Sequence, residues 1–395
     1  MRPRARRVLL VAPQPFYEPR GTPMNVLQMC RVLTAAGYRV DLATFPLGRD
    51  VAMPGLEIHR ALRLPGISAL PIGFSKRKLA LDASLALLVL GLVLRRRYAL
   101  VHAVEEAVFL ALPLTWLGLP LVADLDSSIS HQLAYTGVLR EGVALRAVRA
   151  LERLALRRSK AAITVCQALT EVARELSPGT RIFQVEDAPL EESLRDPDPA
   201  AVEALRGEHG LEGRRAVVYT GNLESYQGLD LLLAAAPLVR ERVPEVAFLL
   251  VGGEPAQAEA FAARVRGLGL AGTVLALGAR PPAEMPEWMA LGELLVSPRS
   301  QGQNTPLKIY TYMRSGRPIV ATDLETHTQV LDPGCAALCP PTPEGLAEAL
   351  ARGLEDPARF APLAKAARKK VEAEYSFEAF RRKLLAAYAA LAPLP

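Results

Sequence analysis

The sequence has few aromatic residues and few cysteines, and it contains no hydrophobic run long enough to span a membrane. Aromatics make up 6% of the 395 residues, and there are four cysteines. The cysteines stand singly in apolar segments, and Cys335 and Cys339 have neither a second pair nor a nearby histidine, which argues against a disulfide scaffold and a zinc knuckle. We therefore expect reduced core cysteines in a cytoplasmic protein without a bound metal.

The net charge is only +6, so the chain has no large excess of basic or acidic residues. The basic clusters at 75–78, 95–97 and 156–160 all lie in the first half, and no aromatic residues are interleaved with them. This pattern argues against nucleic acid as a partner and keeps an anionic membrane surface as a candidate.

The segment between the first two basic clusters, "LALDASLALLVLGLVL", is as apolar as a membrane span but too short, and it carries Asp82. Two interpretations remain open for it. It is either a buried core helix or a helix that lies on a bilayer surface, with the flanking Lys and Arg side chains at the lipid headgroups.

The length of the chain predicts two domains of similar size. Short apolar runs alternate with amphipathic, helix-length segments in both halves, which is typical of parallel sheets covered by helices. We expect strands at 7–13, 39–45, 55–61, 100–104, 120–125, 161–166 and 181–187 in the first half, and at 216–221, 247–253, 273–278, 293–298 and 318–323 in the second. The predicted fold is α/β, with Rossmann-like domains at 1–190 and 191–375 and a final helix at 376–395 that packs back on the first domain.

Two segments repeat one pattern: "RGTPMNVLQMCRVLTAAGYRVDLAT" and "QNTPLKIYTYMRSGRPIVAT". In each, a Thr-Pro pair precedes a helix, and a glycine ends that helix before a strand. Thr22 and Thr305 are predicted N-caps, which would place helix N-termini, with their free N–H groups, at the ligand end of each sheet. The alternative is that both Thr-Pro pairs are merely good helix starts.

Four segments then occur in order: "YTGNLESYQGLDLLLAAAPLV", "AFLLVGGEP", "TVLALGARPPAEMPEWMALGELLVSPRS" and "NTPLKIYTYMRSGRPIVATD". Together they resemble the C-terminal half of the retaining family 4 glycosyltransferases, and the first half is compatible with the same family. The resemblance implies the GT-B fold, with two facing Rossmann-like domains, a nucleotide-sugar donor held by the C-terminal domain, and an acceptor approached from the N-terminal domain. It implies neither a metal nor a cofactor.

The chain departs from the family pattern where many members carry charged residues. Gln303 and Thr311 replace two glutamates, and Asn222 and Gln227 replace an arginine and a lysine that grip the diphosphate. In one interpretation the donor still binds, with its charge met by Lys308 and the helix start at Thr305. The further candidate donor-site residues are Gly21, Thr22, Gly253, Arg280 and Asn304, with Arg20 and Arg299 as reserves. In the other interpretation the donor is unconventional or the site does not turn over.

Asp126, in "VADLDSSISHQ", stands where the resemblance places a histidine that touches the donor sugar, and it is our candidate catalytic residue. Its alternative role is a helix N-cap. We expect Glu105 and Glu106 to stabilise a helix start, and His102 to be a hydrogen-bonded core histidine. For His327, the cleft edge and a capping or turn role both remain open.

The sequence thus predicts a retaining, metal-independent hexosyltransferase that uses a nucleotide-sugar donor and a lipid-linked or envelope glycan acceptor, with no cofactor. We expect it to be cytoplasmic or peripheral to the inner face of the membrane. Two alternatives remain: a non-catalytic nucleotide or sugar binder on the same scaffold, and a nucleotide-sugar epimerase.

Overall fold

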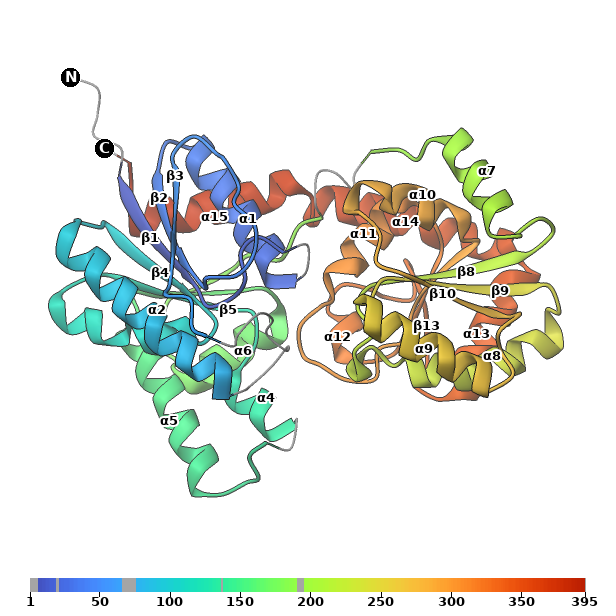
Figure 1. Ribbon diagram of the computed structural model, residues 1–395, viewed down its shortest axis with the longest axis horizontal. Helices are drawn as coiled ribbons and strands as arrows, with labels where there is room; N and C mark the ends of the chain where they lie inside the picture. Colours follow the sequence, from blue (N-terminus) through green and yellow to red (C-terminus); the bar gives the residue numbers. More distant parts are fainter. Residues whose placement is uncertain (1–5, 19–20, 66–75, 136–137, 190–194, 395) are drawn as a thin grey trace. The chain divides into compact units, whose positions relative to one another are not determined.

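The computed structural model describes residues 6–18, 21–65, 76–135, 138–189 and 195–394. The chain forms two compact units, one of residues 1–187 with 378–395 and one of residues 188–377, and each has its own parallel sheet (Figure 1). The predicted α/β fold with two parallel-sheet domains is therefore confirmed.

Unit 1 contains a seven-stranded sheet in the order β3-β2-β1-β4-β5-β6-β7. Its strands are β1 (Arg7–Ala12), β2 (Arg39–Thr44), β3 (Leu56–Arg60), β4 (Leu100–Val104), β5 (Leu121–Leu125), β6 (Ala161–Thr164) and β7 (Ile182–Gln184). Its helices are α1 (Gly21–Ala35), α2 (Lys76–Arg95), α3 (Ala107–Ala111), the 3-10 helix η1 (Leu112–Leu117), α4 (Ile129–Tyr135), α5 (Val143–Arg158), α6 (Gln167–Leu176) and α15 (Phe377–Leu391).

Unit 2 contains a six-stranded sheet in the order β10-β9-β8-β11-β12-β13. Its strands are β8 (Arg215–Thr220), β9 (Val246–Val251), β10 (Val274–Gly278), β11 (Leu294–Ser297), β12 (Ile319–Thr322) and β13 (Ala337–Cys339). Its helices are α7 (Pro199–Glu208), η3 (Ser225–Gln227), α8 (Leu229–Arg242), α9 (Pro255–Gly267), η4 (Pro282–Glu284), α10 (Met285–Leu291), α11 (Leu307–Ser315), α12 (Glu325–Thr328), α13 (Pro343–Glu355) and α14 (Pro357–Glu374).

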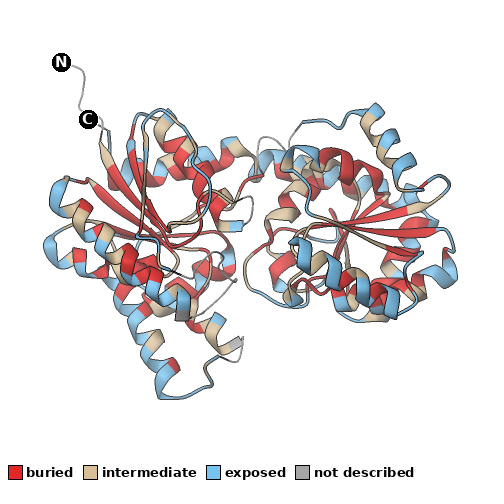
Figure 2. Cartoon of the chain, in the orientation of Figure 1, coloured by how far each residue is buried: buried red, intermediate tan, exposed pale blue. Residues whose placement is uncertain are grey.

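Each strand predicted from the apolar runs is present, because central parallel strands are buried on both faces and read as continuous hydrophobic segments (Figure 2). All five residues of β4 are buried, for example. The sequence analysis missed β13, whose three residues at the sheet edge are too few to show a period. The four cysteines are buried and unbridged, as expected.

Helix α2 carries the apolar segment "LALDASLALLVLGLVL", for which the sequence left two interpretations open, a buried core helix and a helix on a bilayer surface. Its residues Leu81, Leu85 and Val89 are buried against the sheet of unit 1. Leu87 and Leu94, on its other face, are 67% and 75% exposed. One face of the helix thus packs in the core, as the core-helix interpretation expected, whereas its other face is exposed. None of the described helices is long and apolar enough to cross a bilayer.

Helix α15 packs on unit 1 through three long-range hydrogen bonds at its C-terminal end. The Tyr388 hydroxyl lies 2.7 Å from His102 Nδ1 on β4. Tyr38 Oη donates to the carbonyl of Ala392 at 2.9 Å, and Lys160 Nζ donates to the carbonyl of Leu391 at 2.8 Å. The last helix is thus bound to unit 1 by contacts between residues at least 231 positions apart in the sequence. A local sequence pattern cannot predict such contacts.

Both predicted threonine N-caps are wrong. Helix α1 begins at Gly21, so Thr22 is its second residue, and α11 begins at Leu307 with Pro306 in the N-cap position. Thr305 lies one residue farther out, and its buried hydroxyl has no hydrogen-bond partner among the described residues. The prolines do lie at the helix starts, since a missing N–H costs nothing there.

Candidate functional site

The sheet order of unit 2 places a topological switch point between β8 and β11. Helix α8 packs with α9 and α13 on one face of the sheet, whereas α11 packs with α10 and α14 on the other. In open parallel sheets, ligands bind beyond the carboxyl ends of the strands where the connections diverge in this way. The loops that follow β8 and β11 are therefore where a ligand of unit 2 is expected.

These loops approach one another so closely that two positions require glycine. A Cβ added to Gly228, whose φ is +71°, would lie 1.9 Å from the carbonyl oxygen of Pro298 after β11. A Cβ on Gly252, at φ +135°, would lie 1.9 Å from the carbonyl oxygen of Gly221 after β8. Only glycine tolerates both the positive φ and this backbone contact. The three loops are thereby held together at one end of the sheet.

A chain of hydrogen bonds links three predicted donor-site residues at this switch point. Lys308 Nζ donates to Gln227 Oε1 at 3.0 Å, and Gln227 Nε2 donates to Asn222 Oδ1 at 3.1 Å. The amide of Asn222 in turn donates to the Tyr226 hydroxyl at 3.1 Å. The two amides that replace the expected arginine and lysine therefore connect to a cation supplied by α11.

Lys308 has an environment that favours an incoming anion. Burial and the charge of Arg299 both lower the pKa of its ammonium well below the usual value. Its Nζ lies 3.8 Å from the centroid of the Tyr219 ring, which stabilises the charged form. Because desolvation and a like charge act in the same direction, a bound phosphate would relieve both effects.

Arg299 organises the loop that follows β11. Its guanidinium donates to the carbonyls of Gln301 at 2.7 Å and Asn304 at 3.2 Å, and to Asn304 Oδ1 at 3.1 Å. It also lies 5.2 Å from the centroid of the Tyr226 ring. Sequence reasoning held Arg299 only in reserve and did not single out Tyr219 or Tyr226, whose roles become visible only when the loops meet.

The other predicted donor-site residues are less closely connected to this group. The Gln303 carbonyl accepts a 2.6 Å hydrogen bond from Gln329, and Thr311 lies one turn beyond Lys308 on α11. Gly253 lies against Leu223 in the loop after β8. Arg280 lies 5.3 Å from the centroid of the Trp288 ring, which is buried in the core of unit 2. Arg20 is outside the described residues.

His327 is a buried structural histidine. Its Nε2 lies 2.8 Å from Ser297 Oγ, and its Nδ1 lies 2.8 Å from the carbonyl oxygen of Thr322. Burial lowers its pKa to about 4, so the ring is neutral near pH 7. It connects the ends of β11 and β12 and lies beneath the surface instead of lining it.

In unit 1 the corresponding switch point lies between β1 and β4, and Glu105 follows β4 directly. Its φ is +52°, which is rare for a residue with a Cβ, and its backbone N–H donates to the carbonyl of Asp124 at 2.8 Å. Burial, then the charge of Glu106, raise the pKa of Glu105 to about 7. Glu106 is at the N-cap position of α3, the helix start that the sequence predicted for this pair, and it forms an ion pair with Lys78.

Asp126 lies just beyond β5 and is 7% exposed. Burial raises its pKa well above the usual value, and the charges of Asp124, Glu105 and Asp187 act in the same direction. The side chain of Thr22, on α1, forms a hydrogen bond with it, while Asp126 Oδ1 has no partner among the described residues. The structure thus brings together two residues that the sequence placed in separate motifs.

The N-cap alternative for Asp126 is wrong, because α4 begins at Ile129. Ser128 precedes the helix, and its hydroxyl accepts from the backbone N–H of His131 at 3.4 Å. The neighbouring Asp124 is held by His102, whose Nε2 lies 3.0 Å from Asp124 Oδ2. His102 is therefore a hydrogen-bonded core histidine, as expected.

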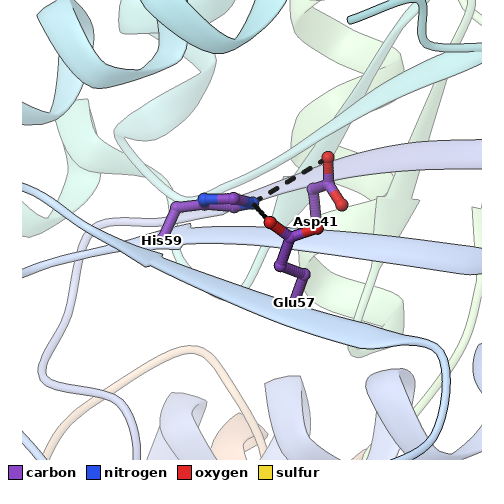
Figure 3. Close-up of side chains that lie close together, drawn as sticks. All are labelled: Asp41, Glu57 and His59. Carbon is purple, nitrogen blue, oxygen red and sulfur yellow. Dashed lines mark ion pairs between the residues drawn. The ribbon is translucent and has the colours of Figure 1, made fainter.

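A separate cluster of Asp41, Glu57 and His59 has the composition of a metal site (Figure 3). Arg7 Nη1 and Arg96 Nη1 lie 2.7 Å and 2.9 Å from the Asp41 carboxylate, and Arg96 also pairs with Glu57. Although burial acts in the opposite direction, hydrogen bonds from His59 and Arg7 hold the pKa of Asp41 well below its usual range. Two guanidinium groups already neutralise these carboxylates, so the cluster is a structural ion-pair network between strands.

Two family models match the chain, one in each unit. Residues 20–186 match a model described as "Glycosyl transferase 4-like domain". Residues 214–356 match a model described as "Glycosyl transferases group 1". The first match includes the residues that follow β4, and the second includes the loops after β8 and β11.

Curated relatives are similar over most of the chain. An alpha-D-kanosaminyltransferase from Streptomyces kanamyceticus is 28% identical over 278 residues, which are 69% of this chain and 71% of that protein. A phosphatidyl-myo-inositol mannosyltransferase from Mycolicibacterium smegmatis is 27% identical over 364 residues, or 89% of this chain and 85% of that protein.

Solved structures share the fold at lower identity. Sucrose-phosphate synthase from Thermosynechococcus elongatus matches with a TM-score of 0.77 at 20% identity, covering 98% of this chain and 99% of that one. HepE from Anabaena, solved in complex with UDP-glucose, matches with a TM-score of 0.73 at 18% identity, covering 98% and 100%.

Proposed function

Since the chain belongs to the family 4 glycosyltransferases and has their GT-B fold, we propose that it transfers a sugar from a nucleoside diphosphate sugar to a lipid-linked or envelope glycan acceptor, with retention. The observation that carries this proposal is the hydrogen-bonded group of Asn222, Gln227 and Lys308 at the switch point of unit 2. In this group a desolvated cation and neutral amides lie where the fold binds ligands.

The proposed donor complex places the diphosphate against Lys308 and near the start of α11, where free N–H groups favour an anion. The positive charge of Lys308 and Arg299 supports metal-independent binding, because it would offset the charge of the leaving phosphates. The amides of Asn222, Gln227 and Asn304 are suited to sugar hydroxyls, which they can bind as donors or acceptors. The binding of UDP-glucose by the structurally similar HepE supports a nucleotide-sugar donor.

In unit 1, Asp126 is the proposed acceptor-side residue. Its unpartnered oxygen can accept a hydrogen bond from the acceptor hydroxyl, and its pKa, raised by burial and by neighbouring acids, makes it a stronger base than an ordinary aspartate. Retention would follow from attack on the same face as the departing phosphate, which assists deprotonation. Asp126 would then orient the hydroxyl and share its proton, without forming a covalent bond to the sugar.

We expect Lys308→Met to weaken binding of the preferred nucleoside diphosphate by about tenfold to a hundredfold, because it removes one hydrogen bond to a charged group. Calorimetric titration with UDP, GDP, ADP and their sugar conjugates would identify the base and measure the loss. Arg314→Met, at the other end of α11, is the control and should leave the affinity unchanged. Equal affinities for Lys308→Met and the parent protein would contradict the proposed donor site.

The same titrations, followed by turnover assays, separate the proposed enzyme from its alternatives. A non-catalytic binder would take up the nucleotide sugar without consuming it, even with acceptors present. An epimerase would isomerise the donor without any acceptor. Release of nucleoside diphosphate that depends on an acceptor is the result that supports glycosyl transfer.

We further propose that unit 1 docks on an anionic membrane surface through α2 and α5, in keeping with the lipid acceptor named for the mannosyltransferase relative. Leucines on the outer face of α2 are exposed beside basic residues, and α5 combines exposed Val143, Leu151 and Leu154 with exposed arginines. Both helices contact α3 and share the core of unit 1. Such basic amphipathic helices lie at lipid interfaces.

We expect the purified protein to sediment with phosphatidylglycerol vesicles at low salt, and the double variant Leu87→Glu, Leu94→Glu to lose most of that binding. Leu268→Glu, at an exposed apolar position in unit 2, is the matched control and should bind like the parent protein. If the parent protein stays in the supernatant, or if both variants bind equally, this surface does not dock on lipid.

A further inference from the structure

Four carboxyl groups gather at the carboxyl ends of β4, β5 and β7 in unit 1, with Asp124 at the second-to-last position of β5 and the others just beyond the strands. We call Glu105, Asp124, Asp126 and Asp187 the acid cluster. Strand register pairs Val104 with Asp124, so the residues that follow these strands lie at one edge of the sheet. The charges of Asp124, Glu105 and Asp187 act on Asp126, and that of Asp124 acts on Asp187. The four groups therefore behave as one electrostatic unit.

The lysines nearest to the acid cluster are paired with other acids. Lys78 forms an ion pair with Glu106, and Lys383 forms one with Glu186. His102 binds Asp124 Oδ2. Within the described part of the chain, no lysine or arginine forms a salt bridge with Glu105, Asp126 or Asp187. Among the described residues, the charge of Lys78 acts on Glu105, whereas Asp126 and Asp187 have no ion-pair partner.

Three oxygens of the cluster also lack hydrogen-bond donors. Oδ1 of Asp124, of Asp126 and of Asp187 are each buried without a partner among the described residues. The side chains of Asp124 and Asp126 are at least nine-tenths buried, with 2% and 7% exposed. Unpaired buried acceptors are costly, so their retention at the ligand end of a sheet points to a donor-rich ligand.

A single metal ion does not fit this arrangement. Three ligand atoms within 4.8 Å of one another are found in the described residues only for Asp41, Glu57 and His59, not in the acid cluster. One metal ion therefore cannot be held by three of these carboxylates at once. A larger ligand with several N–H and O–H donors would reach them.

We propose that the acceptor bound by unit 1 carries a protonated amine, as an amino sugar does. This inference rests on the proposed function, since it names the chemical class of the acceptor. The ammonium group would lie between Asp124 and Asp187, whose Oδ1 atoms are unpartnered and whose charges interact. Asp126 would remain available to the reacting hydroxyl.

The electrostatics of the cluster agree with this assignment. Burial and the charges of Asp124 and Glu186 raise the pKa of Asp187 to about 7. A cation beside these carboxylates would favour their ionised forms, so binding of an amine should release protons near neutral pH. A neutral polyol would leave the mutual repulsion in place.

The full-length protein should distinguish amines from their hydroxyl analogues. The probes are two amines, 6-amino-6-deoxyglucose and glucosamine. Each is compared with glucose and with N-acetylglucosamine, in which the nitrogen is a neutral amide. Their affinities are measured by ligand-observed NMR with UDP present. At about pH 7.5 most Asp187 is ionised, and we expect the amines to bind about tenfold more tightly than glucose, since a charge-assisted hydrogen bond is gained. Asp187→Asn should abolish the preference, whereas Asp50→Asn, an exposed acid of the same unit, should keep it.

The comparison is made first on the parent protein, so it does not depend on whether a variant folds. Equal affinities for the amines and their neutral analogues, or no binding of either amine, would overturn the inference. Donor binding is measured separately by calorimetry with UDP and depends on unit 2. UDP binding without an amine preference refutes this inference alone. An amine preference without binding of any nucleotide refutes the proposed donor and leaves the cation site in place.

Discussion

Asp126→Asn is expected to lower kcat by about a hundredfold or more while leaving the affinity for the nucleoside diphosphate unchanged. Asparagine keeps the shape and can accept the hydrogen bond from Thr22, but it cannot take a proton from the acceptor. Initial-rate kinetics with saturating donor would measure the loss, and calorimetry would confirm intact donor binding.

The pH profile adds a second readout for Asp126. A group that must be ionised to act loses activity as the pH falls through its pKa, and here that pKa is raised by burial and by neighbouring acids. The parent enzyme should therefore lose kcat on the acid side at a higher pH than an ordinary aspartate would cause, and Asp126→Asn should lack that limb. Asp50→Asn is the matched control. A variant with normal kcat would show that Asp126 is not used in turnover.

Gly228→Ala is expected to cost about 3 kcal/mol or more of the free energy of unfolding. The new methyl group would meet the Pro298 carbonyl, an overpacking cost of about 1–3 kcal/mol, and φ of +71° adds about 1–2 kcal/mol for a residue with a Cβ. The thermal midpoint of unit 2 should fall by about 6 °C or more. Because the clash lies between the loops after β8 and β11, binding of the nucleoside diphosphate should weaken as well.

Gly210→Ala separates the two causes. Gly210 also has a positive φ, +60°, but nothing lies within 4 Å of an added Cβ. This variant should lose only about 1–2 kcal/mol of unfolding free energy, which is the cost of a positive φ for a residue with a Cβ, and it should bind the nucleotide normally. Thermal or denaturant unfolding of both variants measures the two losses. Equal losses of unfolding free energy would mean that the Pro298 contact relaxes without cost.

Apolar runs were sufficient to predict every strand of the two sheets except β13, because buried parallel strands need continuous Val, Leu, Ile and Ala regardless of their neighbours. The helix starts were predicted less well. Thr22 and Thr305 have the composition of N-caps, but the observed helices place Thr22 inside the first turn of α1 and Thr305 outside α11. Boundaries of this kind depend on how the loop before the helix packs, which local propensity does not encode.

In the candidate donor site, too, the sequence predicted individual residues but not their contacts. The sequence singled out Asn222, Gln227 and Lys308 one by one, through a family resemblance, as substitutions and a possible replacement cation. Their hydrogen-bonded chain joins residues 81 positions apart, and it forms because β8 and β11 are neighbours in the sheet. Arg299 and Tyr226 join the group for the same reason.

From the amino-acid sequence we could predict the fold class, every strand except β13 and the segments that carry the family resemblance, because these follow from hydrophobic periodicity and from short motifs. The tertiary structure alone decided which polar residues meet. Thr22 lies against Asp126, Tyr388 lies against His102, and the carboxyl groups at the ends of β4, β5 and β7 form one acid cluster. The physical reason is that parallel strands bring their carboxyl ends to one edge of a sheet in an order set by long crossover connections. Burial at that edge then shifts pKa values through groups far apart in the chain.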